Sequence, residues 1–214
     1  MIPNLQIALD NNTLESALES IRLAGPEVDI IEAGTILCLA EGMKAVKCLR
    51  SVFPDKIIIA DTKCADAGGT VAKNCREAGA DWMTVICNAT IATMKAAKEE
   101  IGELQVELYG NWTYEDAQQW LDAGIDQAIY HQSRDALLSG ETWGERDLER
   151  VRKLIDMGFR VSVTGGLTKE TLELFRGLNV YTFITGRGIT AAPDQAQAAR
   201  DFKAEIVRIW GNEE

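Results

Sequence analysis

Hydrophobic and polar positions along the chain follow two different periods, and segments of the two kinds alternate. Short apolar runs rich in β-branched residues predict buried strands, because such side chains favour extended backbone. Eight runs of this kind recur through the sequence, at 5–10, 28–34, 56–62, 82–87, 104–110, 127–132, 160–166 and 180–186. The chain is therefore expected to form eight strands, separated by segments of another type.

The intervening segments have helical length and an amphipathic pattern, as at 13–24, 115–124, 146–158 and 194–210. Glycine follows several of them, where a helix C-terminus favours it, at Gly25, Gly79, Gly124 and Gly158. Strands that alternate with helices predict a parallel sheet. Eight such units in 214 residues predict an α/β protein, a closed (β/α)₈ TIM barrel that forms a single domain over residues 1–214. A doubly wound open sheet is the alternative, but the first turn lacks a G-x-G-x-x-G fingerprint.

Polar residues gather at one end of the predicted strands. In this type of barrel, functional groups lie at the C-terminal ends of the strands. Those ends here carry Asp10, Glu32, Asp61, Lys63, Glu107, His131, Arg134, Thr164 and Arg187. The opposite ends carry no matching set, so an active site is expected at the C-terminal rim.

The acids at this rim indicate a cation site. Glu32 and Asp61 end consecutive strands, which would lie about 4.8 Å apart. Two carboxylates at that separation repel by roughly 3 kcal/mol at an effective dielectric constant of about 20. A shared proton or a bound cation would relieve this repulsion, and oxygen-only ligands favour Mg²⁺. The alternative is that each carboxylate caps a helix or pairs with Lys63. The single histidine excludes a zinc site built on several histidines.

The third run ends in three charged residues, within "ADTKCAD" at 60–66. Asp61 and Lys63 are two positions apart, so in extended backbone both would face the barrel mouth. A lysine among acids stays protonated and could stabilise an anion that develops during a reaction. Asp66 lies beyond the strand.

The last three strand ends suggest phosphate binding and proton transfer. "VTGG" at 163–166 and "ITGRG" at 184–188 expose backbone N–H groups where many barrels bind phosphate. Gly166 and Gly186 lie in these turns, and Arg187 adds a charged donor. In "YHQSRD", at 130–135, His131 and Arg134 are candidates for a general acid or for positioning a water molecule.

Charge and composition exclude several classes of protein. The net charge of −11 argues against nucleic-acid binding, which needs a basic surface. No run of 18 apolar residues predicts a membrane span, and the N-terminus does not resemble a signal peptide. Five cysteines without a C-x-x-C pair indicate reduced thiols and a cytoplasmic protein.

These motifs also carry a resemblance. D-x-K-x-x-D at 61–66 resembles the orotidine 5′-monophosphate decarboxylase superfamily. Glu32, "VELYG", "YHQSRD" and "VTGG" narrow the resemblance to the family of 3-keto-L-gulonate 6-phosphate decarboxylases, over residues 4 to 210. The resemblance implies a homodimer of barrels that uses Mg²⁺ to decarboxylate a phosphorylated keto sugar acid to L-xylulose 5-phosphate, in the catabolism of L-ascorbate and related sugar acids.

The resemblance also implies a role for each site residue. Glu32 and Asp61 would bind the metal, and Asp10 would bind substrate hydroxyls. Lys63 would stabilise a cis-enediolate intermediate, together with Asp66 from the other subunit. His131 and Arg134 would deliver the proton, with Glu107 and Thr164 as further site residues. Arg187, with the backbone near Gly166 and Gly186, would hold the phosphate.

Two alternatives remain at this point. One is 3-hexulose-6-phosphate synthase, an aldolase that passes through a similar enediolate. In that family the positions of Glu107, Arg134 and Thr164 resemble Asp, Val and Ala, and this sequence has none of the three. The other is a non-catalytic phosphosugar-binding barrel, which would gain little from Lys63 among intact metal ligands.

Overall fold

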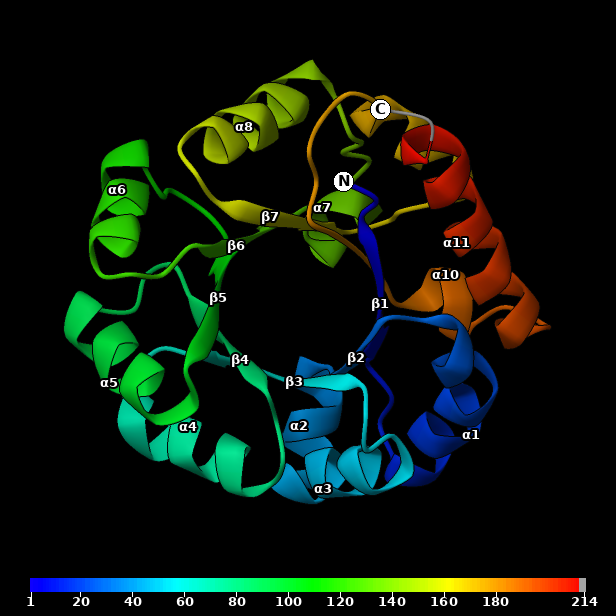
Figure 1. Ribbon diagram of the computed structural model, residues 1–214, viewed down its shortest axis with the longest axis horizontal. Coiled ribbons are helices and arrows are strands. Elements are labelled where there is room, and N and C mark those ends of the chain that lie inside the picture. Colours follow the sequence, from blue (N-terminus) through cyan, green and yellow to red (C-terminus); the bar gives the residue numbers. More distant parts are fainter. Residues whose placement is uncertain (212–214) are drawn as a thin grey trace.

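Eight parallel strands close into a barrel in the order of the sequence, with β8 paired to β1 (Figure 1). The computed structural model describes residues 1–211, so residues 212–214 of the predicted range lie outside the described part. The strands are β1 (Asn4–Leu9), β2 (Ile30–Ala33), β3 (Ile57–Cys64), β4 (Trp82–Ile86), β5 (Glu103–Leu108), β6 (Gln127–His131), β7 (Arg160–Thr164) and β8 (Thr182–Thr185). This arrangement confirms the predicted (β/α)₈ barrel.

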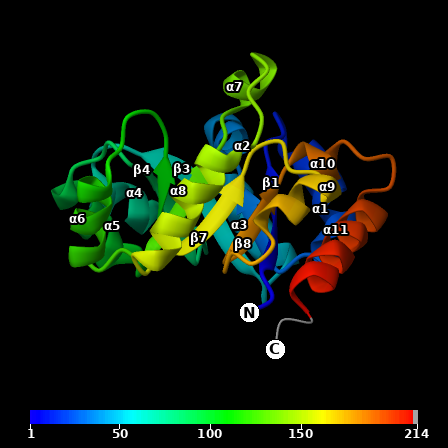
Figure 2. The same cartoon turned by 90° about the horizontal axis from the view of Figure 1, so that it is seen from above.

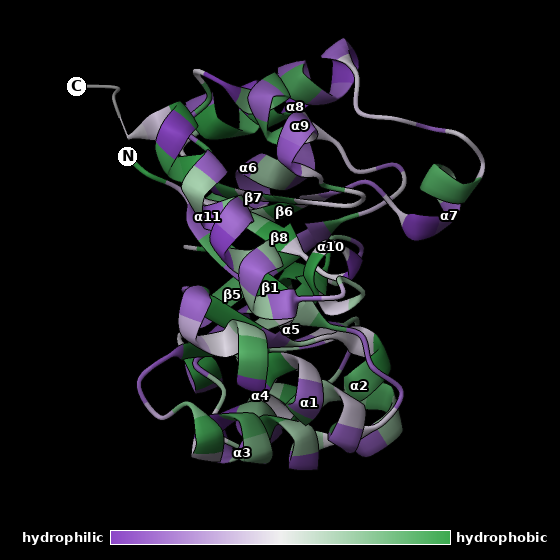
Figure 3. Ribbon diagram, turned by 90° about the vertical axis from the view of Figure 1, so that its right-hand side faces the viewer, coloured by the Kyte–Doolittle hydropathy of each residue, from purple (hydrophilic) through white to green (hydrophobic). Residues whose placement is uncertain are grey.

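Helices surround the barrel, and their ribbons carry both hydrophilic and hydrophobic residues (Figure 3). They are α1 (Leu14–Ala24), α2 (Thr35–Glu41), α3 (Met43–Val52), α4 (Gly68–Glu77), α5 (Ile91–Ile101), α6 (Tyr114–Asp122), α7 (Arg134–Leu138), α8 (Glu145–Asp156), α9 (Lys169–Leu172), α10 (Arg187–Thr190) and α11 (Gln195–Trp210), with 3₁₀ turns at Gly25–Glu27 and Glu173–Phe175. Within residues 1–211, no helix is both long and apolar enough to cross a membrane.

Each strand divides its side chains between two environments. In β5, Leu104, Val106 and Leu108 belong to the main hydrophobic core between the strands and the helices. Gln105 and Glu107 alternate with them and therefore face the barrel interior. The core thus forms a ring around the barrel, and the interior is a separate environment.

The barrel interior is more polar than is usual for this fold, in which branched apolar residues dominate. Ile30, Ile59 and Trp82 form a small apolar cluster there, and Ala8, Ile129 and Ile184 form another. The other buried interior side chains include Gln6, Thr84, Gln105, Gln127, Ser162 and Thr182. A polar interior of this kind can support charged groups placed above it.

The loop between β6 and α8 carries α7 away from the body of the barrel, at the C-terminal end of the strands. Figure 2 shows α7 projecting on one side of the molecule, with the N-terminus and the last described residues on the other. Residues that α7 presents are therefore available to the rim where the sequence predicts the active site.

The glycines expected after helices have two different roles. Gly79, Gly124 and Gly158 have left-handed backbone, as predicted, with φ of 95°, 77° and 105°. Gly25 differs, because its φ is −56°, a right-handed conformation open to any residue. A Cβ atom at Gly25 would lie 2.3 Å from Cζ of Phe53, so close packing explains this glycine.

Candidate active site

A cavity of about 850 Å³ opens at the C-terminal ends of the strands. Its lining draws on the strand ends and on the loops that follow β6, β7 and β8. Of the twelve residues predicted for the site, eleven line this cavity: Asp10, Glu32, Asp61, Lys63, Glu107, His131, Arg134, Thr164, Gly166, Gly186 and Arg187. Residues predicted from scattered parts of the sequence therefore come together around one cavity.

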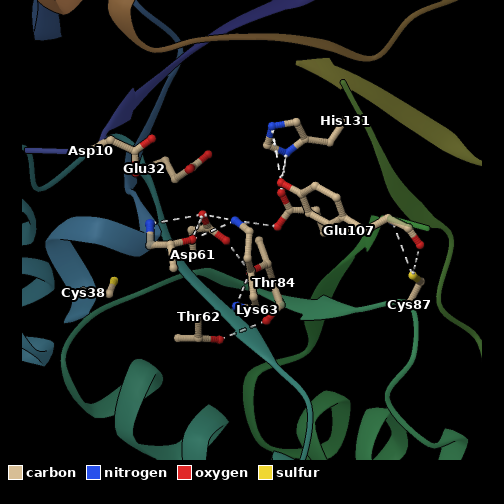
Figure 4. Close-up of polar contacts among 12 residues, drawn as sticks. Asp10, Glu32, Cys38, Asp61, Thr62, Lys63, Thr84, Cys87, Glu107 and His131 are labelled. Atoms are coloured by element: carbon tan, nitrogen blue, oxygen red, sulfur yellow. Dashed lines mark hydrogen bonds and ion pairs between the residues drawn. The ribbon is translucent and has the colours of Figure 1, made fainter. Parts of the chain in front are cut away.

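Lys63 lies at the centre of the acidic group (Figure 4). Its Nζ is 2.7 Å from Oδ2 of Asp61 and 2.8 Å from Oε2 of Glu107, and it donates to Oγ1 of Thr35 at 2.7 Å. Burial alone would lower the pKa of Lys63, but the two carboxylates outweigh burial and raise it. The ammonium group thus remains charged within the cavity.

The backbone of Lys63 departs from the extended conformation that the sequence suggested. Its φ is 44°, a left-handed conformation that is uncommon outside glycine. The pairing of β3 with β4 shifts register between Ala60 and Cys64. Lys63 and Asp61 do face the same cavity, as predicted, but an irregularity in β3 brings them together rather than simple alternation.

Asp61 is held by several donors at once. Its Oδ2 accepts from the backbone N–H of Thr35 at 3.1 Å and from Oγ1 of Thr35 at 2.5 Å, besides Lys63. Its Oδ1 accepts from Oγ1 of Thr84 at 2.6 Å. Burial would raise the pKa of Asp61, but Lys63 and these hydrogen bonds lower it overall. Asp61 is therefore an ionised and fixed carboxylate.

Glu32 has the opposite environment. Its side chain is buried and accepts a hydrogen bond from Nε2 of Gln6. Burial, followed by the charge of Asp61, raises the pKa of Glu32 well above its usual value. Glu32 pairs across the sheet with Ile59, so Asp61 lies two residues further along β3, and its charge still acts on Glu32.

This donor set fits a hard cation. Among residues 1–211, no group of three or more His, Cys, Asp and Glu side chains is arranged to hold a metal ion. Mg²⁺ does not need such a group, because it commonly binds through one or two carboxylates and completes its shell with water and substrate oxygens. The buried Glu32 carboxyl is destabilised in its charged form, and a cation beside Asp61 would relieve this.

The raised pKa of Glu32 predicts that the metal-free protein loses stability as the pH rises. The folded state holds the Glu32 proton more tightly than the unfolded state does, so the free energy of unfolding falls as pH rises above about 4.3. Metal-free Glu32→Gln is therefore expected to unfold at a higher temperature than metal-free wild type at pH 7, with the difference vanishing near pH 4. Thermal unfolding in EDTA measures this. Glu99→Gln, at an exposed position, is the control. A Glu32→Gln protein that is less stable than wild type at pH 7 would contradict the prediction.

Glu107 connects Lys63 to His131. Its Oε2 faces Lys63, and its Oε1 lies 2.6 Å from Nδ1 of His131. The Tyr109 hydroxyl is 2.7 Å from the same Nδ1. Burial, followed by Glu107, raises the pKa of Tyr109, so Tyr109 stays a neutral phenol. With Nδ1 of His131 as the donor to Glu107, Nε2 of His131 is the acceptor nitrogen, and it lies 3.3 Å from the Tyr109 hydroxyl.

Arg134 and Asp10 meet across the cavity mouth. Arg134 begins α7, and its Nη2 lies 3.4 Å from Oδ2 of Asp10, which follows β1. The Arg134 side chain is 48% exposed. The projecting α7 thus places a positive charge beside the end of β1, three strands around the barrel from its own attachment to β6.

The loop after β7 needs glycine for close approach and for left-handed backbone. Gly165 has φ of 107°, and a Cβ atom there would lie 2.1 Å from the carbonyl oxygen of Gln132. Gly166 has φ of 61°. Thr164 Oγ1 donates to the carbonyl oxygen of Ile184 at 3.1 Å and so ties β7 to β8. Arg187 begins α10 and is exposed at the cavity edge.

Asp66 is the predicted site residue that lies elsewhere. In the described chain it is exposed, in the turn between β3 and α4, and does not line its own cavity. Its backbone carbonyl accepts from Sγ of Cys64 at 3.1 Å. The role of Asp66 in a second subunit stays a prediction.

Sequence reasoning missed four polar residues that contact the predicted groups: Gln6, Thr35, Thr84 and Tyr109. Thr84 and Gln6 are in the middle of apolar strands, on the face shared with inward residues, and that isolated polarity was the available signal. Tyr109 is two positions after Glu107. Thr35 reaches Asp61 from the first turn of α2, and this contact depends on tertiary structure.

Most of the chain matches a known protein family. The model of the family described as "Orotidine 5'-phosphate decarboxylase / HUMPS family" matches residues 3–202. The chain belongs to this family. Membership agrees with the superfamily expected from the D-x-K-x-x-D motif and with the barrel found here.

Particular members of the family resemble the whole chain. It is 53% identical over 214 residues to 3-keto-L-gulonate-6-phosphate decarboxylase from Salmonella paratyphi B, covering 98% of this chain and 99% of the relative. A crystal structure of KGPDC from Streptococcus mutans is 66% identical with a TM-score of 0.98, over 99% of this chain and 100% of that one. A 3-hexulose-6-phosphate synthase from Salmonella typhimurium is 29% identical with a TM-score of 0.88, over 96% and 99%. Sequence similarity within the family is thus higher to these decarboxylases than to this synthase.

Proposed function

We propose that this protein decarboxylates 3-keto-L-gulonate 6-phosphate to L-xylulose 5-phosphate and CO₂, with Mg²⁺ as its cofactor. The observation that carries the proposal is the position of Lys63, a charged ammonium group between Asp61 and Glu107 in a cavity that also holds the buried Glu32. The full-length similarity to decarboxylases of this substrate supports the choice of reaction.

The proposed chemistry follows from the charges in the cavity. A β-keto acid loses CO₂ readily when the adjacent carbonyl oxygen can take up the electron pair that the broken bond leaves. Bound by Glu32 and Asp61, Mg²⁺ would supply Lewis acidity at the substrate oxygens. Lys63 supplies fixed positive charge to the resulting cis-enediolate, and preorganised charge of this kind is worth about 3 kcal/mol per donor in other enzymes.

Proton delivery is assigned to the other side of the cavity. Glu107 fixes the orientation of His131 by accepting from Nδ1 at 2.6 Å, and Nε2, which lies 3.3 Å from the Tyr109 hydroxyl, is assigned to act on the substrate or on a water molecule. Arg134 extends from α7 toward Asp10, which we assign to substrate hydroxyls. Thr164 lines the same cavity.

Release of CO₂ from 3-keto-L-gulonate 6-phosphate tests this function. EDTA is expected to abolish turnover, and Mg²⁺ is expected to restore it. Full activity after metal removal would contradict the roles of Glu32 and Asp61. No CO₂ release at any Mg²⁺ concentration would contradict the function itself and would favour a non-catalytic barrel.

The phosphate group is assigned to Arg187 and to the backbone near Gly166 and Gly186. Arg187→Ala is expected to raise KM for the phosphorylated substrate by about 10-fold or more, because charged hydrogen bonds contribute roughly 1.5–3 kcal/mol. The value of kcat should change little, because the phosphate does not react. Steady-state kinetics measures both, and Arg200→Ala on α11 is the control. An equal loss on an unphosphorylated analogue would contradict this assignment.

A second candidate is the aldolase reaction, which the likeness to 3-hexulose-6-phosphate synthase favours as a side activity. The shared enediolate would add to formaldehyde in place of a proton. An assay with D-ribulose 5-phosphate and formaldehyde measures it. A faster aldolase than decarboxylase would make the synthase the main function.

The proposed enzyme is a homodimer in which Asp66 of each subunit completes the site of the other. The exposure of Asp66 outside its own cavity supports this arrangement. A cytoplasmic location remains our proposal from the five cysteines, all of which are free.

A further inference from the structure

Thr84 lies in β4 and is fully buried inside the barrel, beneath the cavity. It does not line the cavity in the described chain. Its hydroxyl nevertheless contacts two of the residues assigned to the chemistry, Asp61 and Lys63 (Figure 4).

One contact fixes the carboxylate of Asp61. Thr84 Oγ1 donates its single hydrogen to Oδ1 of Asp61 at 2.6 Å, while Oδ2 of Asp61 is held by Thr35 and Lys63. The hydrogen bond to Oδ1 fixes the rotation of the carboxylate plane about its last torsion. Without it, Asp61 would keep its contacts at Oδ2 but could turn Oδ1 away.

The other contact fixes the backbone of Lys63. The N–H of Lys63 donates to Oγ1 of Thr84 at 2.9 Å. Nearby, Oγ1 of Thr62 donates to the carbonyl oxygen of Thr84 at 2.9 Å. Left-handed backbone at a residue other than glycine persists only where the surroundings determine it strongly. Because the register between β3 and β4 is broken here, the Lys63 N–H donates to the Thr84 side chain in place of a backbone carbonyl of the neighbouring strand.

The hydrogen-bond roles of Thr84 are fully determined. Because its one hydrogen goes to Asp61, a lone pair remains to accept the N–H of Lys63. One hydroxyl therefore sets the relative position of a carboxylate and of the lysine two residues further on. Valine has nearly the same shape but could do neither, and serine could do both.

We propose that Thr84 is a positioning residue that fixes the Asp61 carboxylate and the left-handed Lys63 backbone relative to each other. This inference rests on the proposed function, because Asp61 and Lys63 act there as metal ligand and enediolate-stabilising cation. Thr84 does not line the cavity in the described chain, so we assign it no contact with substrate or metal. It acts by determining where these two groups stand before the substrate binds.

The test compares Thr84→Val and Thr84→Ser with Thr182→Val. Thr182 is a matched control, because it is also fully buried inside the barrel and its hydroxyl has no hydrogen-bond partner in the described chain. Three properties are measured for each variant: kcat and KM for CO₂ release, binding of Mn²⁺ as a spectroscopic probe by electron paramagnetic resonance, and hydrogen exchange of the Lys63 amide by NMR.

Thr84→Val is expected to lower kcat and Mn²⁺ affinity by about 10- to 100-fold each, as loss of residues that orient metal ligands does elsewhere. KM should change much less, because the phosphate site is intact. The Lys63 amide should exchange faster. Thr84→Ser should recover most of each property, and Thr182→Val should match wild type. A general packing defect would not spare Thr182→Val and Thr84→Ser in this way.

The proposal is overturned if Thr84→Val keeps wild-type kcat, Mn²⁺ affinity and Lys63 exchange. If Thr84→Val does not fold, Thr84→Cys replaces it, with a weaker donor of similar size and the same expected directions. Wild-type protein that neither releases CO₂ nor binds Mn²⁺ would refute the proposed function. In that case, hydrogen exchange of the Lys63 amide at the wild-type rate in Thr84→Val would separately refute the positioning role of Thr84.

Discussion

Lys63→Met is expected to lower kcat for CO₂ release by about 100- to 1000-fold, the range seen when one preorganised donor to a developing oxyanion is removed. Methionine keeps much of the length and the apolar stem of lysine but carries no charge. The loss should fall on kcat more than on KM, since the ammonium group is assigned to the intermediate and not to the bound ketone.

The surroundings of Lys63 give the physical reason. Its ammonium group is the positive charge that faces both Asp61 and Glu107, at 2.7 and 2.8 Å. Without it, the enediolate would develop negative charge beside two carboxylates. The variant would then repel the intermediate in addition to losing a donor, so the loss in kcat should be at least about 100-fold.

A lysine at the other end of the barrel provides the matched control. Lys203 on α11 pairs with Asp29, whose carboxylate accepts a hydrogen bond from the backbone N–H of Leu5 near the start of β1. Lys203→Met also breaks an ion pair but is remote from the cavity, so its kcat should match wild type. Circular dichroism checks that both variants fold. A Lys63→Met enzyme with more than a tenth of wild-type kcat would contradict the role assigned to Lys63.

The barrel could be predicted because its sequence signal is repeated and local. Each strand needs a short apolar run, and each helix needs an amphipathic segment, so one misjudged segment does not change the fold. The predicted run at 56–62 illustrates the limit of this signal. Strand β3 extends to Cys64, because the irregularity around Lys63 lets it resume pairing with β4 at Val85.

The convergence of the rim residues could be predicted for a different reason. In a parallel barrel all C-terminal strand ends meet at one rim, so Asp10 and Arg134, 124 positions apart, come together once the topology is known. The sequence also favoured a cation near Glu32, and the charges around Glu32 support this. The cation itself remains a proposal.

Several contacts between side chains of neighbouring strands could not be predicted. Thr84 lies in an apolar strand, and only the broken register of β3 brings the Lys63 N–H to its hydroxyl. Likewise, the contact between Tyr109 and His131 depends on how the ends of β5 and β6 align. Such contacts depend on the distances between strands. The hydrophobic period of a single strand carries no information about those distances.

The proposed sharing of sites between subunits has an equally large expected effect. Lys63→Ala and Asp66→Ala homodimers should both be nearly inactive, because each lacks one group at every site. Mixed after dissociation, the two variants should re-pair at random, so about half of the dimers contain one chain of each kind. In such a dimer one site takes Lys63 from one chain and Asp66 from the other, and is intact. About a quarter of wild-type activity should therefore return.

The activity recovered on mixing depends on whether Asp66 completes the site of its own barrel or that of its partner. If Asp66 acted in its own barrel, each site of a mixed dimer would still lack Lys63 or Asp66, and mixing would restore nothing. Lys63→Ala mixed with Asp61→Ala provides the control, because both side chains line the same cavity and no pairing can rebuild a site. Subunit exchange is confirmed separately with differently tagged chains. Recovery no greater than in this control would refute the shared site, whereas recovery near a quarter requires that Asp66, exposed beside its own barrel, completes the cavity of its partner.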